Sequence, residues 1–153
     1  MAESRILVIR LSSMGDVIHT LPAVASLKHS FPESRLTWLV RPRWTPLLEG
    51  NPYVDEIVPV ERSVNASWAE ASRLRERRFD LAVDFQGLIQ TALLAAAVRP
   101  RELTGFAHPR ERLASWFYSS KVTVRSAHVV EKNLELAAGA GAASLLHEFH
   151  LPP

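Results

Sequence analysis

The stretch Ile6-Leu-Val-Ile-Arg-Leu-Ser-Ser-Met-Gly-Asp-Val-Ile-His-Thr-Leu-Pro22 decides the fold of this chain. Its apolar run from Ile6 to Ile9 is too short for a typical buried helix, and apolar and polar positions do not alternate in it. This pattern favours a strand that is covered on both faces, as in a parallel sheet. Polar residues and Gly15, which lets another group approach the backbone closely, then break the run before a helix begins. Asp16 is expected in the first helical turn, where the helix dipole favours an ionised carboxylate.

The rest of the chain alternates between predicted strands and predicted helices. We expect strands at 35–40, 56–60, 79–84, 101–106 and 121–124. We expect helices at 15–30, 63–78 and 128–138, and a further helix that follows the turn 85–90 and ends at Val98. This alternation predicts an α/β fold with a Rossmann-like, mostly parallel sheet flanked by helices. Such a fold does not by itself give a function.

Composition narrows the class of protein. With 153 residues the chain is long enough for one domain with its own core. No apolar run approaches the roughly 18 residues of a membrane span, and the N-terminus has no convincing signal-peptide pattern. The chain has no cysteine, which excludes disulfides and thiolate chemistry. A net charge of +2 is too small to argue for a nucleic-acid partner. These features fit a cytoplasmic protein.

Two polar junctions between a strand and a helix are expected at the same edge of the sheet. Ligands of open α/β sheets bind beyond the carboxyl ends of the strands, so Asp16 is a candidate for chemistry, although it could be a plain helix N-terminal acid. Asp84 and Gln86 form the second junction, where Gln86 could hydrogen-bond hydroxyl groups and Asp84 could orient the loop. His19 follows Asp16 by three residues and shares its helix face, either as an orienting partner or as a rim residue.

Four sequence motifs resemble the family 9 glycosyltransferases, and among them the type I heptosyltransferases. The motifs are Leu11-Ser-Ser-Met-Gly-Asp-Val-Ile-His-Thr-Leu-Pro22, Asp84-Phe-Gln-Gly-Leu88, Arg110-Glu-Arg-Leu-Ala-Ser-Trp-Phe-Tyr118 and His128-Val-Val-Glu131. The resemblance implies a two-domain GT-B architecture. Residues 1–139 would form the Rossmann-like, acceptor-binding N-terminal domain and residues 140–153 the start of the interdomain linker. The C-terminal donor-binding domain would be absent, because the family's members are about twice as long.

The resemblance also implies an activity and its residues. It implies inverting transfer of heptose from ADP-heptose to the Kdo-lipid A inner core of lipopolysaccharide, without a metal or other cofactor. The enzyme would be cytoplasmic, with possible peripheral contact with the inner membrane. Asp16 would be the general base. The expected substrate-binding residues are Ser12, Ser13, Gly15, His19, Gln86, Gly87, Arg110 and His128. The chain alone is predicted to be inactive.

Two other functions stay open at this point. One is a different family 9 transferase with another donor or acceptor, and the other is a non-enzymatic Rossmann-like module that binds a nucleotide or a partner protein.

Two surface features also have alternatives. Arg73, Arg75, Arg77 and Arg78 either complement a helix dipole or attract an anionic acceptor or membrane. The aromatic run 116–118 is expected in the core rather than as a membrane anchor.

Overall fold

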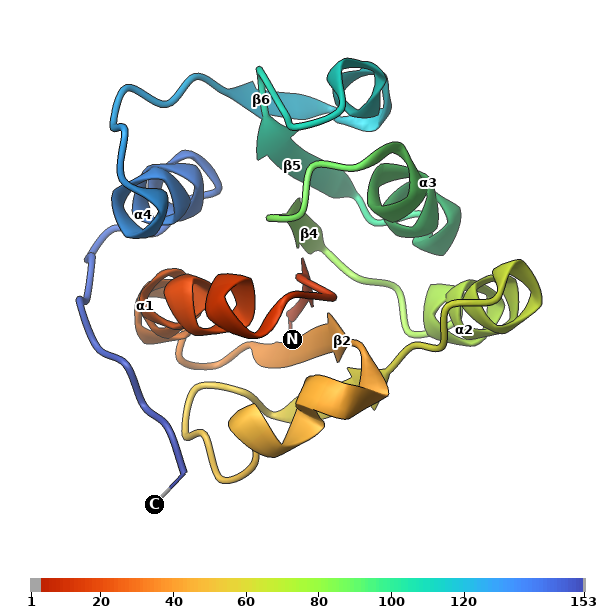
Figure 1. Ribbon diagram of the computed structural model, residues 1–153, viewed down its shortest axis with the longest axis horizontal. Coiled ribbons are helices and arrows are strands. Elements are labelled where there is room, and N and C mark those ends of the chain that lie inside the picture. Colours follow the sequence, from red (N-terminus) through yellow and green to blue (C-terminus); the bar gives the residue numbers. More distant parts are fainter. Residues whose placement is uncertain (1–3, 153) are drawn as a thin grey trace.

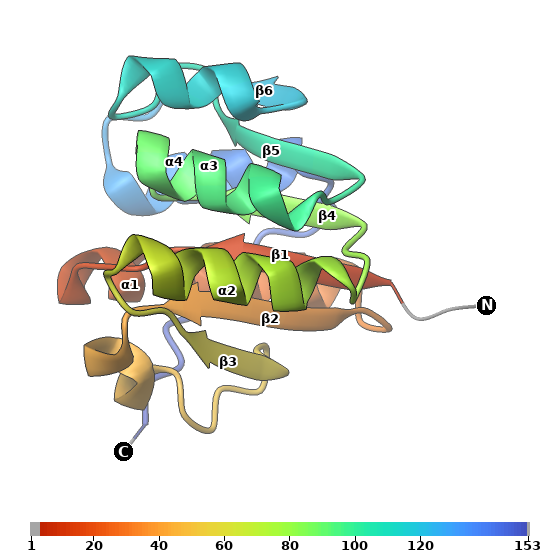
Figure 2. The same ribbon diagram turned by 90° about the vertical axis from the view of Figure 1, so that its right-hand side faces the viewer.

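The computed structural model describes residues 4–152 and contains one six-stranded sheet in the order β3-β2-β1-β4-β5-β6 (Figures 1 and 2). All neighbouring strands pair in parallel. The strands are β1 (Arg5–Ile9), β2 (Arg35–Val40), β3 (Glu56–Pro59), β4 (Leu81–Asp84), β5 (Glu102–Phe106) and β6 (Ser120–Val122). The helices are α1 (Met14–Ser30), α2 (Val64–Arg75), α3 (Ile89–Val98) and α4 (Val129–Gly139), with short 3-10 segments η1 (Pro42–Leu47) and η2 (Arg112–Phe117).

Helices cover both faces of the sheet, as the sequence predicts. In Figure 1, α1 and α4 lie on one face, and α2, α3 and η2 lie on the other. Each face has its own hydrophobic core, and alternate residues of β1 contribute to each: Ile6 and Val8 to one, Leu7 and Ile9 to the other. Burial of β1 on both sides explains its unbroken apolar run.

All predicted helices and strands are present, but several of their boundaries differ: β4 begins at Leu81 instead of 79, and β6 ends at Val122 instead of 124. Strand β2 spans the predicted residues, and β3 with its Pro59 is an edge strand. Helix α1 begins at Met14 and continues through Pro22 to Ser30. Helix α2 ends at Arg75, before the predicted limit, because the chain turns at Arg78 with a positive φ of 58°.

One core prediction is wrong in part. Tyr118 is buried, but the Trp116 side chain is 78% exposed and Phe117 is 37% exposed. The reason is that η2 presents one side to α3 and the other to solvent, so consecutive aromatic residues cannot all reach the core.

The register between β1 and β4 positions the candidate site. Ile9 pairs with Asp84, so the segments after these two strands leave the sheet side by side at its carboxyl edge. Strand β1 is also where the strand order reverses, with β2 on one side and β4 on the other. Open α/β sheets bind ligands in the crevice at such a switch point.

Among the helices within residues 4–152, none is both long and apolar enough to cross a bilayer.

Candidate active site

The loops after β1 and β4 are joined by the side chain of Gln86. Its Oε1 accepts hydrogen bonds from the backbone N–H groups of Leu11, at 3.1 Å, and Ser12, at 3.4 Å. These bonds connect residues that lie about 75 positions apart in the chain. Gln86 therefore fixes the conformation of the first loop, and its amide nitrogen is the part of the side chain left for a ligand.

Asp84 organises the second loop from a fully buried position. Its Oδ1 accepts from the backbone N–H groups of Gln86, at 3.0 Å, and Gly87, at 3.3 Å. Its Oδ2 accepts from the hydroxyls of Thr91, at 3.1 Å, and Tyr118, at 2.6 Å. Burial raises the pKa of Asp84, while these four donors act in the opposite direction. The carboxylate is surrounded by protein donors, which confirms the predicted role of orienting the loop.

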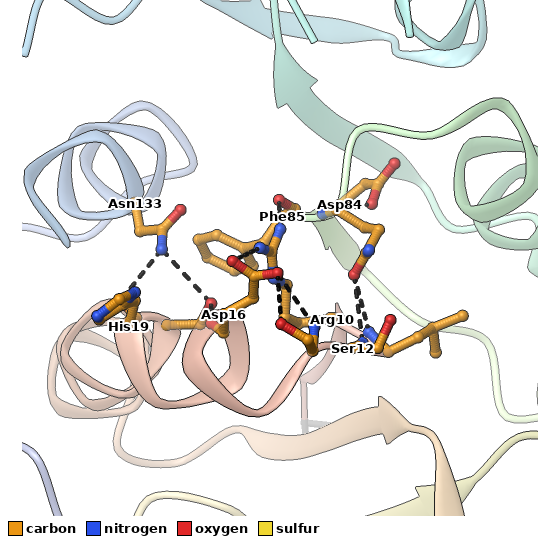
Figure 3. Close-up of polar contacts among 11 residues, drawn as sticks. Arg10, Ser12, Asp16, His19, Asp84, Phe85 and Asn133 are labelled. Atoms are coloured by element: carbon orange, nitrogen blue, oxygen red, sulfur yellow. Dashed lines mark hydrogen bonds and ion pairs between the residues drawn. The ribbon is translucent and has the colours of Figure 1, made fainter. Parts of the chain in front are cut away.

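The carboxylate of Asp16 is held at the start of α1 by two residues (Figure 3). Oδ2 accepts from the backbone N–H and the hydroxyl of Ser13, both at 3.1 Å, and Oδ1 lies 2.9 Å from Nη2 of Arg10. Partial burial raises the pKa of Asp16, but the Ser13 N–H and Arg10 outweigh it, so the pKa lies below its usual value. The side chain is still 34% exposed, so an ionised carboxylate faces solvent.

Arg10 is one of the residues that sequence reasoning missed. It is 9% exposed, and its Nη1 donates to the backbone carbonyl of Phe85 at 2.5 Å while its Nη2 pairs with Asp16. Its guanidinium therefore links both loops to the candidate base. Burial lowers the pKa of Arg10, and the Asp16 carboxylate opposes this effect. The sequence feature that could have identified Arg10 is a cationic residue directly after a predicted buried strand.

A hollow of about 340 Å³ opens in front of Asp16. Its lining comes from the segments that follow β1, β4 and β5, from the start of α1, and from α4 with the segment before it. The lining residues are Arg10, Asp16, Phe85, Gln86, Phe106, His108, Pro109, Arg110, Val124, Val129, Lys132 and Asn133. The lining contains three cationic side chains, of Arg10, Arg110 and Lys132, and one acidic side chain, of Asp16. Such a composition favours an anionic ligand that also carries hydroxyl groups.

Helix α4 is tied to α1 beside this hollow. Nδ2 of Asn133 donates to the carbonyl of His19 at 3.0 Å and lies 3.4 Å from Oγ1 of Thr20. The hollow is therefore bounded by a fixed pair of helices, and Lys132 is positioned with Asn133. Sequence reasoning did not single out Lys132, Asn133 or His108.

The structure brings together three of the predicted site residues, Asp16, Gln86 and Arg110, in this hollow. Gly87 is not part of the lining; it follows Gln86 with a φ of 72°, and a Cβ there would be 3.2 Å from the backbone nitrogen of Arg110. The carbonyl of Gly87 also accepts from the N–H of Glu111 at 2.9 Å. Gly87 therefore allows the loop carrying Arg110 to pack closely.

The other predicted residues lie outside this lining. Ser12 and Ser13 border a second hollow of about 520 Å³ with Arg41, Pro42, Arg43, Trp44, Glu61 and Arg62. His19 is exposed on α1, and His128 is exposed just before α4. An added Cβ at Gly15 would have no atom within 4 Å, so no close approach occurs there in this structure.

The described part of the chain, residues 4–152, holds no group of three or more His, Cys, Asp or Glu side chains placed to share an ion.

Comparison with known protein families gives the decisive match. The model of glycosyltransferase family 9 (heptosyltransferase) matches residues 68–151, which is more than half of the chain. This chain belongs to glycosyltransferase family 9. The resemblance expected from the four motifs is thereby confirmed.

Curated family 9 relatives include heptosyltransferases of two bacteria. Lipopolysaccharide heptosyltransferase 1 of Pseudomonas aeruginosa is 33% identical over 150 residues, which cover 89% of this chain and 42% of the relative. The protein of the same name from Escherichia coli K12 is 31% identical over 148 residues, covering 88% of this chain and 46% of the relative. The chain thus spans less than half the length of these relatives.

Solved structures confirm the fold. The E. coli heptosyltransferase WaaC with ADP superposes with a TM-score of 0.82 at 30% identity, covering 94% of this chain and 49% of that chain. A family 9 glycosyltransferase from Veillonella parvula superposes with a TM-score of 0.85 at 20% identity, over 99% of this chain and 46% of that chain. The six-stranded sheet with its flanking helices is therefore the fold of one part of these family 9 transferases.

Proposed function

We propose that this family 9 chain forms the acceptor side of an inverting heptosyltransferase. The donor would be ADP-heptose, and the acceptor would be the Kdo-lipid A inner core in lipopolysaccharide biosynthesis. The observation that carries the proposal is the partly exposed carboxylate of Asp16, paired with Arg10 at the mouth of a cationic hollow. This residue is also the acid of the first family motif.

Asp16 would act as the general base. An acceptor hydroxyl loses its proton to the carboxylate while its oxygen attacks the anomeric carbon of heptose. The bond between that carbon and the phosphate oxygen breaks, and ADP leaves with the electron pair. Attack from the face opposite the leaving group inverts the anomeric configuration. General-base assistance of this kind typically contributes about 10²–10⁴-fold to the rate.

The environment of Asp16 has two opposing effects on its role as a general base. Arg10 and Ser13 keep the carboxylate ionised and fix its direction, so it is ready to accept a proton. The same contacts make it a weaker base than a free carboxylate. They favour a reaction in which the proton moves late, as the new bond forms.

The cations of the hollow would bind the acidic part of the acceptor. Arg110 and Lys132 line the same hollow as Asp16, and arginine can bind a carboxylate through two parallel hydrogen bonds. Gln86 and Asn133 add amide groups suited to sugar hydroxyls. An acidic sugar such as Kdo matches this combination of charge and polarity.

The donor side of the reaction would be supplied mainly by a second domain. The E. coli enzyme WaaC was solved with ADP, and this chain covers 49% of it. We therefore expect residues 140–153 to begin the linker to that domain. As a separate part of the proposal, the transfer would need no metal or other cofactor. The reaction would take place in the cytoplasm, with peripheral contact to the inner membrane that holds the acceptor.

A titration followed by NMR tests the proposal on this chain. One series adds a deacylated Kdo-containing lipid A core, and a second adds ADP. We expect resonances of Asp16, Gln86 and Arg110 to shift with the acceptor and to respond little to ADP. Tight binding of ADP without any response to the acceptor would overturn the assignment and indicate a nucleotide module.

A substitution separates the transferase from a non-enzymatic module. In an enzyme that carries this half together with its donor half, Asp16→Asn removes the base and should lower transfer by about 10²–10⁴-fold with folding preserved. Glu33→Gln is the matched control, since Glu33 is an exposed carboxylate between α1 and β2 that lies outside the lining of the hollow. Unchanged transfer by the Asp16 variant would exclude Asp16 as the base.

A further inference from the structure

A third hollow, also cationic and of about 660 Å³, lies at the opposite edge of the sheet from Asp16. It is formed where the chain enters β1, β4 and β5 and where α2 and α3 end, at the right of Figure 2. Its lining residues are Ser4, Arg5, Arg75, Arg77, Arg78, Phe79, Asp80, Arg99 and Arg101. We call it the amino-edge hollow. Because it lies across the sheet from Asp16, its arginines cannot serve the acceptor bound there.

The backbone around this hollow is fixed by hydrogen bonds between segments that are distant in the sequence. The N–H of Asp80 donates to the carbonyl of Arg5 at 2.9 Å, and the N–H of Arg101 donates to the carbonyl of Phe79 at 3.0 Å. The N–H of Arg5 in turn donates to Oδ2 of Asp80 at 2.9 Å. Three loops are thereby joined, so the arginines that they carry are held close together before any ligand binds.

Some of these arginines have a structural role that accounts for them. Nε of Arg75 donates to the carbonyl of Ala97 at 2.9 Å and so satisfies the end of α3. Arg77 pairs with Glu56 of β3. Asp80 is the one acid in the lining, and its carboxylate is 3.9 Å from Arg101.

Arg78 and Arg99 have no such explanation. Within residues 4–152 neither guanidinium has an acidic or carbonyl partner. Both residues also have left-handed backbones, with φ of 58° and 57°, just beyond the ends of α2 and α3. Glycine or asparagine occupies such positions without the steric cost that arginine carries. Two exposed arginines with this backbone conformation are unfavourable on local grounds.

We propose that the amino-edge hollow binds a phosphate group. Arginines from three segments line it, and the planar guanidinium fork matches phosphate oxygens in pairs. A bound dianion would give Arg78 and Arg99 an anionic partner. The phosphate could belong to a free ion or to the headgroup of a phospholipid, and this site is independent of the proposed transfer reaction.

The test compares this chain with the double variant Arg78→Gly, Arg99→Gly. Glycine removes both guanidiniums and suits the left-handed backbone, so the variant should fold with an unchanged or higher melting temperature. Pyrophosphate is titrated at constant ionic strength while the side-chain N–H resonances of Arg5 and Arg101 are followed by NMR. In a second arm, co-sedimentation is measured with vesicles of phosphatidylcholine alone and with added phosphatidylglycerol.

We expect wild-type resonances to shift with pyrophosphate, and the double variant to bind about tenfold or more weakly. Binding only to the vesicles with phosphatidylglycerol, lost in the double variant, would support the proposal with a lipid as the source of phosphate. Arg73→Gln is the matched control, because Arg73 lies on α2 outside the lining and pairs with Glu70. The proposal is overturned if wild type binds neither probe, or if the double variant binds as wild type does.

Discussion

Asp16 and Arg10 form a single unit at the residue scale, because each compensates the other's charge. Arg10 is nearly buried and spans from Asp16 to the carbonyl of Phe85. Removing a neighbouring opposite charge typically moves the pKa of a carboxyl by about 1–3 pH units. Arg10→Met should therefore raise the pKa of Asp16, which ¹³C NMR of the carboxyl group can measure.

Two further variants control this measurement. Arg10→Lys keeps a cation and should leave the pKa of Asp16 low, even if the methionine variant folds poorly. Arg110→Met removes a cation that lines the same hollow without bonding to Asp16, and it should have a smaller effect. An Asp16 pKa that is the same in all three variants would contradict the assigned role of Arg10.

The acid stability of the chain should also depend on Asp16. Its pKa is lower in the folded than in the unfolded chain, so its ionised form adds stability above the unfolded pKa. That contribution is lost as the pH falls through the folded pKa. Asp16→Asn should therefore unfold at lower urea than wild type near neutral pH, and the two midpoints should converge in acid. A difference that persists or grows in acid would show that another contact is involved.

At the scale of elements, the turn from β4 to α3 depends on the left-handed backbone of Gly87. Gly87→Ala places a non-glycine residue at a φ of 72° and brings its Cβ against the loop that carries Arg110. Left-handed strain in a non-glycine residue costs about 1–3 kcal/mol. We expect a loss of this size in the free energy of urea unfolding, together with weaker binding of the acidic acceptor.

Gly15→Ala is the matched control for this substitution. It also adds one methyl group at a strand-to-helix junction, but no atom lies within 4 Å of the new Cβ and the backbone has no positive φ. We expect its unfolding free energy to stay within about 0.5 kcal/mol of wild type. Equal losses in the two variants would mean that the conformation of Gly87 is not what matters.

At the scale of the whole molecule, two closed cores on one continuous sheet indicate that this chain folds alone. Cores of buried apolar residues lie on both faces, and all neighbouring strands are paired. We expect one cooperative thermal transition by circular dichroism. We also expect no heptose transfer by the chain alone, since donor binding would require the second half of the enzyme. Measurable turnover would contradict this division of labour.

The sequence by itself determined the elements, the fold class and the family. The apolar run of β1, the spacing of the helices and the position of Asp16 depend on residues close together in the chain, and periodicity records such local relations. Asp84 was also interpreted correctly, because an acid at the end of a buried strand is close to the backbone that it orients.

Only the tertiary structure decided which side chains meet. Arg10 reaches Phe85, and Gln86 reaches Leu11, across 75 residues of sequence, and the β1–β4 register produces both contacts. Local pattern carries no record of such pairs, so the contact that ties Arg10 to the second loop was missed. The amino-edge hollow has the same origin: its arginines come from three loops, which converge because parallel strands begin at one edge of the sheet.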